Sequence, residues 1–219
     1  MKIFVVHYKK LVDRKKHVLD QFQKYNITNY EFVEIDRDEL KEHPIHIFKK
    51  NYSTSQIAIA LSHFYAYQQI SKYYNCGLIF EDDIILSDNF INILKKYMND
   101  LPTNYDMLFI GDGCNLHIEP HEIVLNKNIY EKQLNPTNWD GKRDILPYEG
   151  ATRCCDSYLV SNKCATQICN YISTLDYKID IPIDWWLNIA ARDNNLKIYW
   201  SEPTIVTQGT QNGLFQSSH

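Results

Sequence analysis

Three consecutive acidic residues, Glu81, Asp82 and Asp83, stand between two short apolar runs, Leu78–Phe80 and Ile84–Leu86. Short apolar segments bounded by polar residues are typical of buried strands. Adjacent carboxylates repel one another and are costly to remove from water, so their charge has to be compensated. A divalent cation that prefers oxygen ligands, Mg²⁺ or Mn²⁺, is one compensation. The alternative is a solvated turn in a hairpin.

The first 36 residues indicate how a sheet would position such a site. Lys2–Val6 reads as a strand, Asp13–Tyr25 as a helix and Tyr30–Ile35 as a second strand. This order predicts a βαβ unit and a parallel sheet. Ligands bind beyond the carboxyl ends of such strands, which places four polar residues at the ligand edge: His7, Tyr8, Arg14 and Asp36. The unit contains no glycine-rich phosphate loop.

Two later carboxylates also follow predicted extended segments. Asp112 comes just after the apolar run Tyr105–Ile110, and Asp184 comes after the proline-containing run 179–183. Asp184 precedes a helical stretch, so it is an N-cap candidate, either structural or facing the site. A further helix is expected from the capping-box pattern of residues 53–56 through residue 74. It contains Ser62 and His63, which as direct neighbours do not face each other.

The bulk composition limits the class of protein. The chain has 219 residues, 44% hydrophobic and 23% charged, with a net charge of -4 and a pI near 6.0. These values predict a globular domain without the basic field that nucleic acids or membranes require. No run of 18 apolar residues and no signal-peptide pattern is visible, so we expect a cytoplasmic protein or a trimmed part of a larger chain. The six cysteines form no CxxC pair and are expected to be reduced.

The segment from Cys114 to Pro147 is long and poorly periodic. A loop of this length in a compact domain is expected to be functional or partly folded, so we predict a flap or insertion around 114–147. Its Trp139 could stack on a sugar ring or cover core. Without a convincing linker, residues 1–219 are expected to form a single domain.

Six short motifs follow one another along nearly the whole chain: Val5–Tyr8 with Asp13-Arg14, Ala60–His63, Leu78–Leu86, Asp106 with Leu108–Gly111, Tyr158–Ser161 with Ala165, and Pro182–Asp184 with Leu187. The sequence resembles glycosyltransferase family 25, the lipooligosaccharide and procollagen galactosyltransferase-like enzymes of GT-A type. Three departures stand out: Ala58-Ile59 replaces a small residue and Cys, His7-Tyr8 replaces the usual Asn-Leu, and the C-terminal tail matches poorly.

The resemblance implies an α/β, GT-A-like fold with a Rossmann-like mixed sheet flanked by helices. It also implies a nucleotide-binding half at about 1–112 and an acceptor and catalytic half at about 113–219. It implies metal-dependent transfer of a hexose, of galactose or glucose type, from a nucleotide-sugar donor to an acceptor hydroxyl with inversion. The donor is expected to be a UDP-sugar and the cation Mn²⁺ or Mg²⁺. A glycan, a lipid-linked saccharide or a protein hydroxyl would be the acceptor, and no nucleic acid is expected as a partner.

The resemblance also implies residue roles. Because side chains alternate along an extended segment, Glu81 and Asp83 are expected to point together toward the metal, with Asp83 as the direct ligand. Asp82 would face a ribose or serve the structure. The general base is expected to be Asp184, with Asp112 second and Asp180 third. On the donor side, Arg14 is expected near the diphosphate, Asp36 near the ribose or base, and Ser62 and His63 along or behind the pocket, beside His7 and Tyr8.

Two other classes of function remain possible on the sequence. A metal-dependent phosphohydrolase also uses acids at strand ends, but the common nucleophile is an aspartate near the first strand, whereas this chain has Glu81 deep in the sequence. A non-catalytic carbohydrate- or nucleotide-binding module of the same fold is the other alternative. Slow hydrolysis of a nucleotide-sugar with Mn²⁺ would distinguish a transferase from a binding module.

Overall fold

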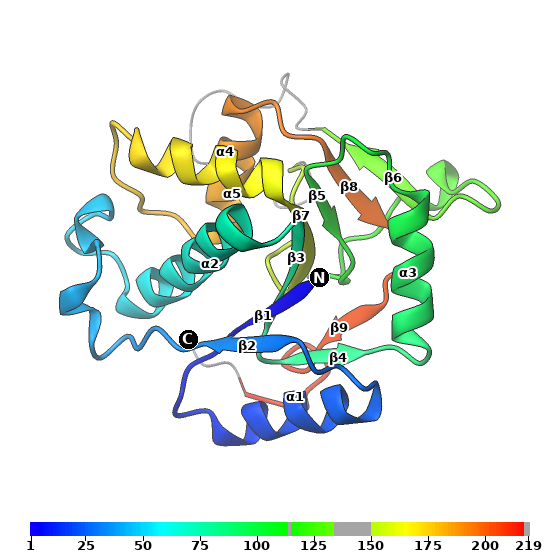
Figure 1. Ribbon diagram of the computed structural model, residues 1–219, viewed down its shortest axis with the longest axis horizontal. Coiled ribbons are helices and arrows are strands. Elements are labelled where there is room, and N and C mark those ends of the chain that lie inside the picture. The colour runs from blue at the N-terminus through cyan, green and yellow to red at the C-terminus, as the bar shows by residue number, and fades with distance from the viewer. Residues whose placement is uncertain (114, 134–149, 217–219) are drawn as a thin grey trace.

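The computed structural model describes residues 1–113, 115–133 and 150–216 and is built around a seven-stranded mixed sheet (Figure 1). The strand order is β2-β1-β3-β7-β5-β8-β6. Helices cover both faces, so the predicted α/β architecture is confirmed. The strands of this sheet are β1 (Lys2–Val6), β2 (Tyr30–Val33), β3 (Cys76–Glu81), β5 (Met107–Phe109), β6 (Ile129–Lys132), β7 (Ser157–Ser161) and β8 (Ile198–Ser201).

Side chains point alternately to the two faces of the sheet, and this divides the core into two layers. In β1, Ile3 and Val5 pack on one face of the sheet, while Phe4 and Val6 pack on the other. The first face is covered by α1 (Val12–Lys24) and α3 (Phe90–Asp100), and the second by α2 (Thr54–Tyr73), α4 (Asn162–Ser173) and α5 (Ile183–Asp193). Short 3-10 turns lie at Leu40–Glu42, Ile45–Ile47 and Pro120–Glu122. Fully buried strands of this kind carry apolar residues on both faces.

The βαβ unit predicted at the start of the chain is confirmed. β1 pairs in parallel with β2 and with β3, so the carboxyl ends of these three strands meet at one edge of the sheet. β7 is different, because it runs antiparallel between β3 and β5. Its amino-terminal end therefore reaches the edge where β3 and β5 finish.

The acidic segment does not form the tip of a hairpin. β3 pairs with β1 and β7, whereas β4 (Ile84–Leu86) pairs with β9 (Val206–Gln208) in a separate two-stranded sheet. The three acids thus join two different sheets. This pairing also brings the C-terminal segment of the chain next to them.

Three local predictions are corrected by the structure. The N-cap of α5 is Pro182, and Asp184 lies in the first helical turn instead. Ser53 stands at the N-cap of α2, but its hydroxyl bonds to that of Ser55 at 2.8 Å and caps no backbone N–H. Part of the expected flap around 114–147 is the edge strand β6, antiparallel to β8. Residue 114 and residues 134–149, with Trp139, lie outside the described part of the chain.

None of the helices in the described part of the chain is both long and apolar enough to cross a membrane.

Candidate active site

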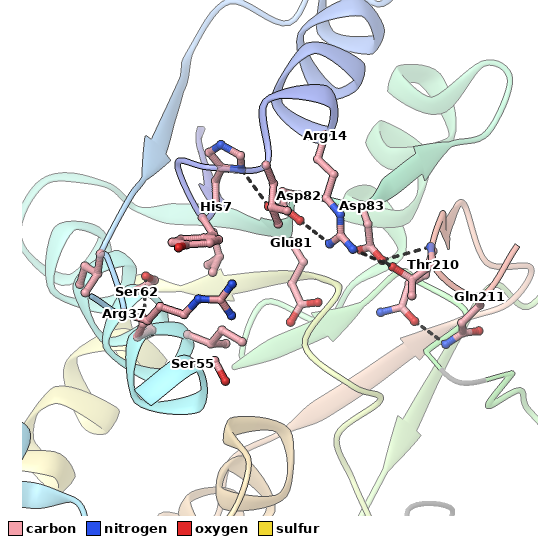
Figure 2. A pocket seen from close by; sticks show the side chains of 17 residues that line it. His7, Arg14, Arg37, Ser55, Ser62, Glu81, Asp82, Asp83, Thr210 and Gln211 are labelled. Carbon is pink, nitrogen blue, oxygen red and sulfur yellow. Dashed lines mark hydrogen bonds and ion pairs between the residues drawn. The ribbon is translucent and has the colours of Figure 1, made fainter. Parts of the chain in front are cut away.

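A cavity of about 310 Å³ opens at the carboxyl ends of β1 and β3. Figure 2 shows the Arg37 and Glu81 side chains extending toward its middle. The wall is completed by the first turn of α1, the N-terminal half of α2 and the residues after β9. Among the residues that line it are His7, Tyr8, Arg14, Arg37, Ser55, Ser62, Glu81, Asp82, Asp83, Gln208, Thr210 and Gln211.

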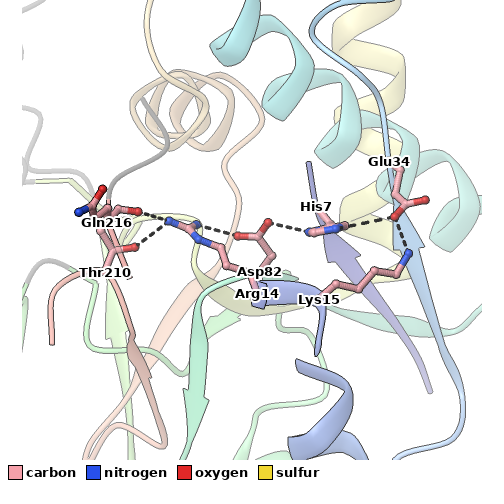
Figure 3. Close-up of polar contacts among 7 residues, drawn as sticks. All are labelled: His7, Arg14, Lys15, Glu34, Asp82, Thr210 and Gln216. Carbon is pink, nitrogen blue, oxygen red and sulfur yellow. Dashed lines mark hydrogen bonds and ion pairs between the residues drawn. The ribbon is translucent and has the colours of Figure 1, made fainter. Parts of the chain in front are cut away.

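Both oxygens of Asp82 are engaged by other side chains. Oδ2 lies 2.8 Å from His7 Nδ1, and Oδ1 accepts a 2.8 Å hydrogen bond from Arg14 Nη1 (Figure 3). All three side chains are buried. A buried charge is tolerated when it is paired and hydrogen-bonded, and Asp82 meets both conditions. Asp82 thus holds His7 and Arg14 together, and it also lines the cavity.

The same network continues away from the cavity. His7 Nε2 lies 3.8 Å from Glu34 Oε1, and Lys15 Nζ lies 2.6 Å from that same oxygen. On the other side, Arg14 Nη2 donates to the backbone oxygen of Gln216 at 2.6 Å. One chain of polar contacts therefore ties β1, α1, the β3–β4 turn and the C-terminal segment together (Figure 3).

Asp83 and Glu81 are compensated less completely. Asp83 is 4% exposed, and its Oδ2 accepts hydrogen bonds from the backbone N–H of Thr210 at 3.3 Å and from the Thr210 hydroxyl. Asp83 Oδ1 is buried and has no hydrogen-bond partner. Burial, followed by the negative charge of Asp83, raises the pKa of the half-buried Glu81 well above its ordinary value. Asp83 therefore keeps one unsatisfied carboxylate oxygen at this point of the cavity, and its charge disfavours ionisation of the neighbouring Glu81.

An unsatisfied carboxylate oxygen beside a second carboxyl group fits the chemistry of a hard divalent cation. Carboxylate oxygens are the ligands that Mn²⁺ and Mg²⁺ prefer, and an orphaned buried carboxylate oxygen is available on Asp83. Within the described ranges, no three His, Cys, Asp or Glu side chains are arranged to hold a metal by themselves. A cation here would need further oxygens from a ligand, such as the diphosphate of a nucleotide, or from water.

Asp156 is a carboxylate that the sequence reasoning missed. It is fully buried, it accepts a 3.0 Å hydrogen bond from the Ser157 hydroxyl, and its Oδ1 has no partner. Burial raises the pKa of Asp156 to about 8. A Cβ at Gly111 would lie 1.9 Å from Asp156 Oδ2, so only glycine leaves room for this side chain. The acid precedes a strand, and the antiparallel direction of β7 brings that end next to Glu81, whose backbone N–H donates to the Asp156 backbone oxygen at 2.8 Å.

A second cavity, also of about 310 Å³, contains Asp184. It shares Ile59, Glu81 and Gln208 with the first cavity, so the two meet at these residues. Its other lining residues are Gln56, Cys154, Cys155, Pro182, Ile183 and Asp184. Burial raises the pKa of the Asp184 carboxyl.

The three other predicted acids lie differently. Asp112 has a buried Oδ1 without a partner and a pKa raised by burial, yet it is not among the residues described as lining either cavity. Asp36 is held by Lys9 Nζ at 2.7 Å, which lowers its pKa, while its neighbours Ile35 and Arg37 line the first cavity. Asp180 pairs with Lys49.

Ser62 and His63 point in different directions, as neighbours on a helix must. Ser62 lines the first cavity and donates to the Ala58 backbone oxygen at 2.8 Å. His63 is fully buried on the core side, with Nδ1 2.7 Å from the Tyr158 hydroxyl. Burial lowers the pKa of His63 to about 3, so it is neutral at pH 7. His63 is not among the residues described as lining the first cavity.

Tyr8 and Arg37 form one side of the first cavity. The Arg37 guanidinium carbon lies 4.0 Å from the centre of the Tyr8 ring, and the Tyr8 hydroxyl donates to Asp38 at 3.0 Å. Tyr8 was predicted at this edge, whereas Arg37, Ser55, Gln208, Thr210 and Gln211 were not. Arg37 could have been found, because it follows the second strand of the βαβ unit. The residues after 207 carry no comparable signal in the sequence.

Comparison with known proteins finds relatives by sequence. A family model described as "Glycosyltransferase family 25 (LPS biosynthesis protein)" matches residues 1–184. A putative glycosyltransferase of Acanthamoeba polyphaga mimivirus is 33% identical over 144 residues, which cover 60% of this chain and 42% of that protein. The match therefore spans less than half of this relative's length.

Solved structures of glycosyltransferases are also similar. A variant of the Drosophila β1,4-galactosyltransferase 7, in complex with manganese, UDP-Gal and xylobiose, has a TM-score of 0.46 and 11% identity, covering 93% of this chain and 65% of that one. The galactosyltransferase LgtC, with donor and acceptor sugar analogs, has a TM-score of 0.49 and 8% identity over 95% and 86%. Since both scores are below 0.5, the assignment rests on the sequence match. Its extent, residues 1–184, shows that the chain belongs to glycosyltransferase family 25.

Proposed function

We propose that this glycosyltransferase transfers a hexose, of galactose or glucose type, from a UDP-sugar to an acceptor hydroxyl with inversion, and that it depends on Mn²⁺ or Mg²⁺. The observation that carries the proposal is the meeting of two cavities of similar size at Glu81. A transferase needs one site for the donor and one for the acceptor, and the two sites must meet where the sugar is transferred.

The first cavity is the proposed donor site. Tyr8 and Arg37 provide an aromatic face and a positive charge for the nucleotide, and Ser62 adds to the wall. Arg14, expected near the diphosphate, is buried against Asp82. Its proposed role is therefore mainly to hold the pocket in shape. Asp83, with Glu81, would hold the cation, which when bound neutralises charge that develops on the departing diphosphate.

The second cavity is the proposed acceptor site, with Asp184 as the general base. A base must lie within hydrogen-bond reach of the hydroxyl that it deprotonates. The raised pKa of Asp184 makes its carboxylate a stronger base than an exposed one. As the acceptor oxygen forms its bond to the anomeric carbon, the hydroxyl proton passes to Asp184 and the bond to the nucleoside diphosphate breaks.

The two halves of the chain divide this work in the proposal. Residues of about 1–112 contribute most of the donor cavity, and residues beyond 113 contribute Asp184. The halves are not separate bodies, because β7 from the second half lies between β3 and β5 of the first. Gln208 and Thr210 from the second half also line the donor cavity.

A thermal-shift screen tests the choice of donor. UDP-, GDP- and dTDP-hexoses are added to the protein with and without Mn²⁺. A ligand at about 100 times its Kd stabilises the folded state by about 2.7 kcal/mol. We expect the largest increase in Tm with a UDP-hexose and Mn²⁺ together. Equal shifts with all three nucleotides would contradict the choice of UDP, and no shift with any of them would contradict donor binding.

A further inference from the structure

The residues after β9 form a C-terminal strap, Gly209–Gln216, which lies beyond the segment matched by the family model. Its first two residues are bound to Asp83. The Gly209 N–H donates to the Asp83 backbone oxygen at 2.6 Å, and the Thr210 N–H donates to Asp83 Oδ2 at 3.3 Å. The Thr210 hydroxyl contacts the same carboxylate oxygen. Main chain and side chain of the strap thus act on one acid of the donor cavity.

The direction of the Thr210 hydrogen bonds follows from its second neighbour. Arg14 Nη2 donates to Thr210 Oγ1 at 3.4 Å, and a guanidinium can only donate. The hydroxyl therefore accepts from Arg14 and has its single proton left for Asp83. Thr210 therefore links the Arg14 guanidinium, which is paired with Asp82, to the carboxylate of Asp83.

The far end of the strap is fastened to α1. Arg14 Nη2 donates to the Gln216 backbone oxygen at 2.6 Å, and the Phe215 ring lies 5.4 Å from the Arg14 guanidinium carbon and 5.2 Å from the His17 ring. A Cβ at Gly209 would lie 2.7 Å from the Phe215 ring. The strap is therefore packed tightly against the site at both of its ends.

We propose that Thr210 is a positioning residue for the cation site, and this inference rests on the proposed role of Asp83. Thr210 satisfies Asp83 Oδ2 and leaves Oδ1, which has no partner, for the cation. Carboxylates that bind metals are commonly oriented by such hydrogen bonds, and removal of the partner typically lowers metal affinity 10- to 100-fold. Thr210 lies outside residues 1–184, so the family match gives no indication of its positioning role.

The test measures Mn²⁺ binding directly, by the EPR signal of free Mn²⁺ during titration in the presence of saturating UDP. Thr210→Val removes the hydroxyl with little change in shape, and we expect a Kd for Mn²⁺ raised by about 10- to 100-fold. Thr210→Ser keeps the hydroxyl and is expected to stay near the wild-type Kd. Thr207→Val is the matched control, because Thr207 contacts Asn212 and not Asp83.

The outcomes separate the inference from the function on which it rests. A wild-type Kd in Thr210→Val, or a lower one, overturns the positioning role while the cation site stands. Absence of Mn²⁺ binding by the wild type overturns the cation site and the inference with it. Thermal melting checks the fold of each variant, and Thr210→Ala, which keeps the backbone N–H, replaces Thr210→Val if the latter does not fold.

Discussion

Glu81, Asp82 and Asp83 are neighbours in the sequence, yet their surroundings differ. The two oxygens of Asp82 contact the Arg14 guanidinium and the His7 imidazole. One oxygen of Asp83 is bound by Thr210, and the other has no partner. Glu81 lies between the two cavities and has a raised pKa. The sequence predicted that these acids belong together at a strand end. Their different partners come from β1, α1 and residue 210, which only the fold brings together.

Replacement of Asp83 tests its assignment to the cation. Asp83→Asn removes the charge but keeps the shape, so Mn²⁺-dependent release of UDP from a UDP-hexose should fall by at least about 100-fold, because a bound cation contributes several kcal/mol to the transition state. Thermal melting without ligands should show a folded protein. Turnover equal to that of the wild type would show that Asp83 does not hold the cation.

Replacement of Asp184 tests the general base. Asp184→Asn should retain the wild-type Kd for UDP and lose transfer by about 10²- to 10⁴-fold, the range typical of general-base catalysis. A large loss of UDP binding would instead indicate a role in binding or folding.

The pH profile of the wild type tests the same residue. Asp184 accepts a proton only when it is ionised, and burial raises its pKa. Transfer should therefore fall as the pH decreases through this raised pKa, at a higher pH than for an exposed aspartate. A rate that stays constant down to the range of an ordinary aspartate would contradict Asp184 as the base.

At the scale of elements, the Asp82 network fixes α1 and β1 against the β3–β4 turn. The prediction from sequence placed His7 and Arg14 at this edge because both follow the first strand of a βαβ unit. It did not predict that their shared partner would be Asp82, since a contact between residues 7 and 82 depends on β3 lying beside β1. The direction of β7 was likewise beyond the sequence pattern, and Asp156 was missed for that reason.

Removal of the Asp82 carboxylate should destabilise this arrangement. Asp82→Ala leaves a buried Arg14 and His7 without their partner, and loss of one member of a buried ion pair costs about 3–5 kcal/mol. We expect this decrease in the free energy of unfolding from urea denaturation. Asp38→Ala is the control, because its pair with Lys10 is exposed and its loss should change stability far less than the loss of Asp82. Equal effects of the two changes would contradict a structural role for Asp82.

At the scale of the whole molecule, one sheet is made from both halves of the chain, and the C-terminal segment returns to the donor cavity. The α/β class and the initial βαβ unit follow from local apolar patterns, so they could be predicted. The pairing of β4 with β9, the edge strand β6 and the strap depend on contacts between distant residues. Of the residues that line the second cavity, the sequence analysis predicted Glu81 and Asp184 as site residues, but it did not predict the cavity itself.

The most direct test of the proposed function is an NMR time course of UDP-galactose or UDP-glucose with Mn²⁺ and the wild-type protein. Slow donor hydrolysis reports the chemistry even without a known acceptor, and it shows the configuration of the sugar that is released first. Since these donors are α-linked, inversion predicts that UDP release is accompanied first by the β-anomer, and that Asp184→Asn suppresses both. Initial release of the α-anomer would contradict inversion, and no Mn²⁺-dependent release from either donor would contradict the proposed transfer of a hexose from UDP.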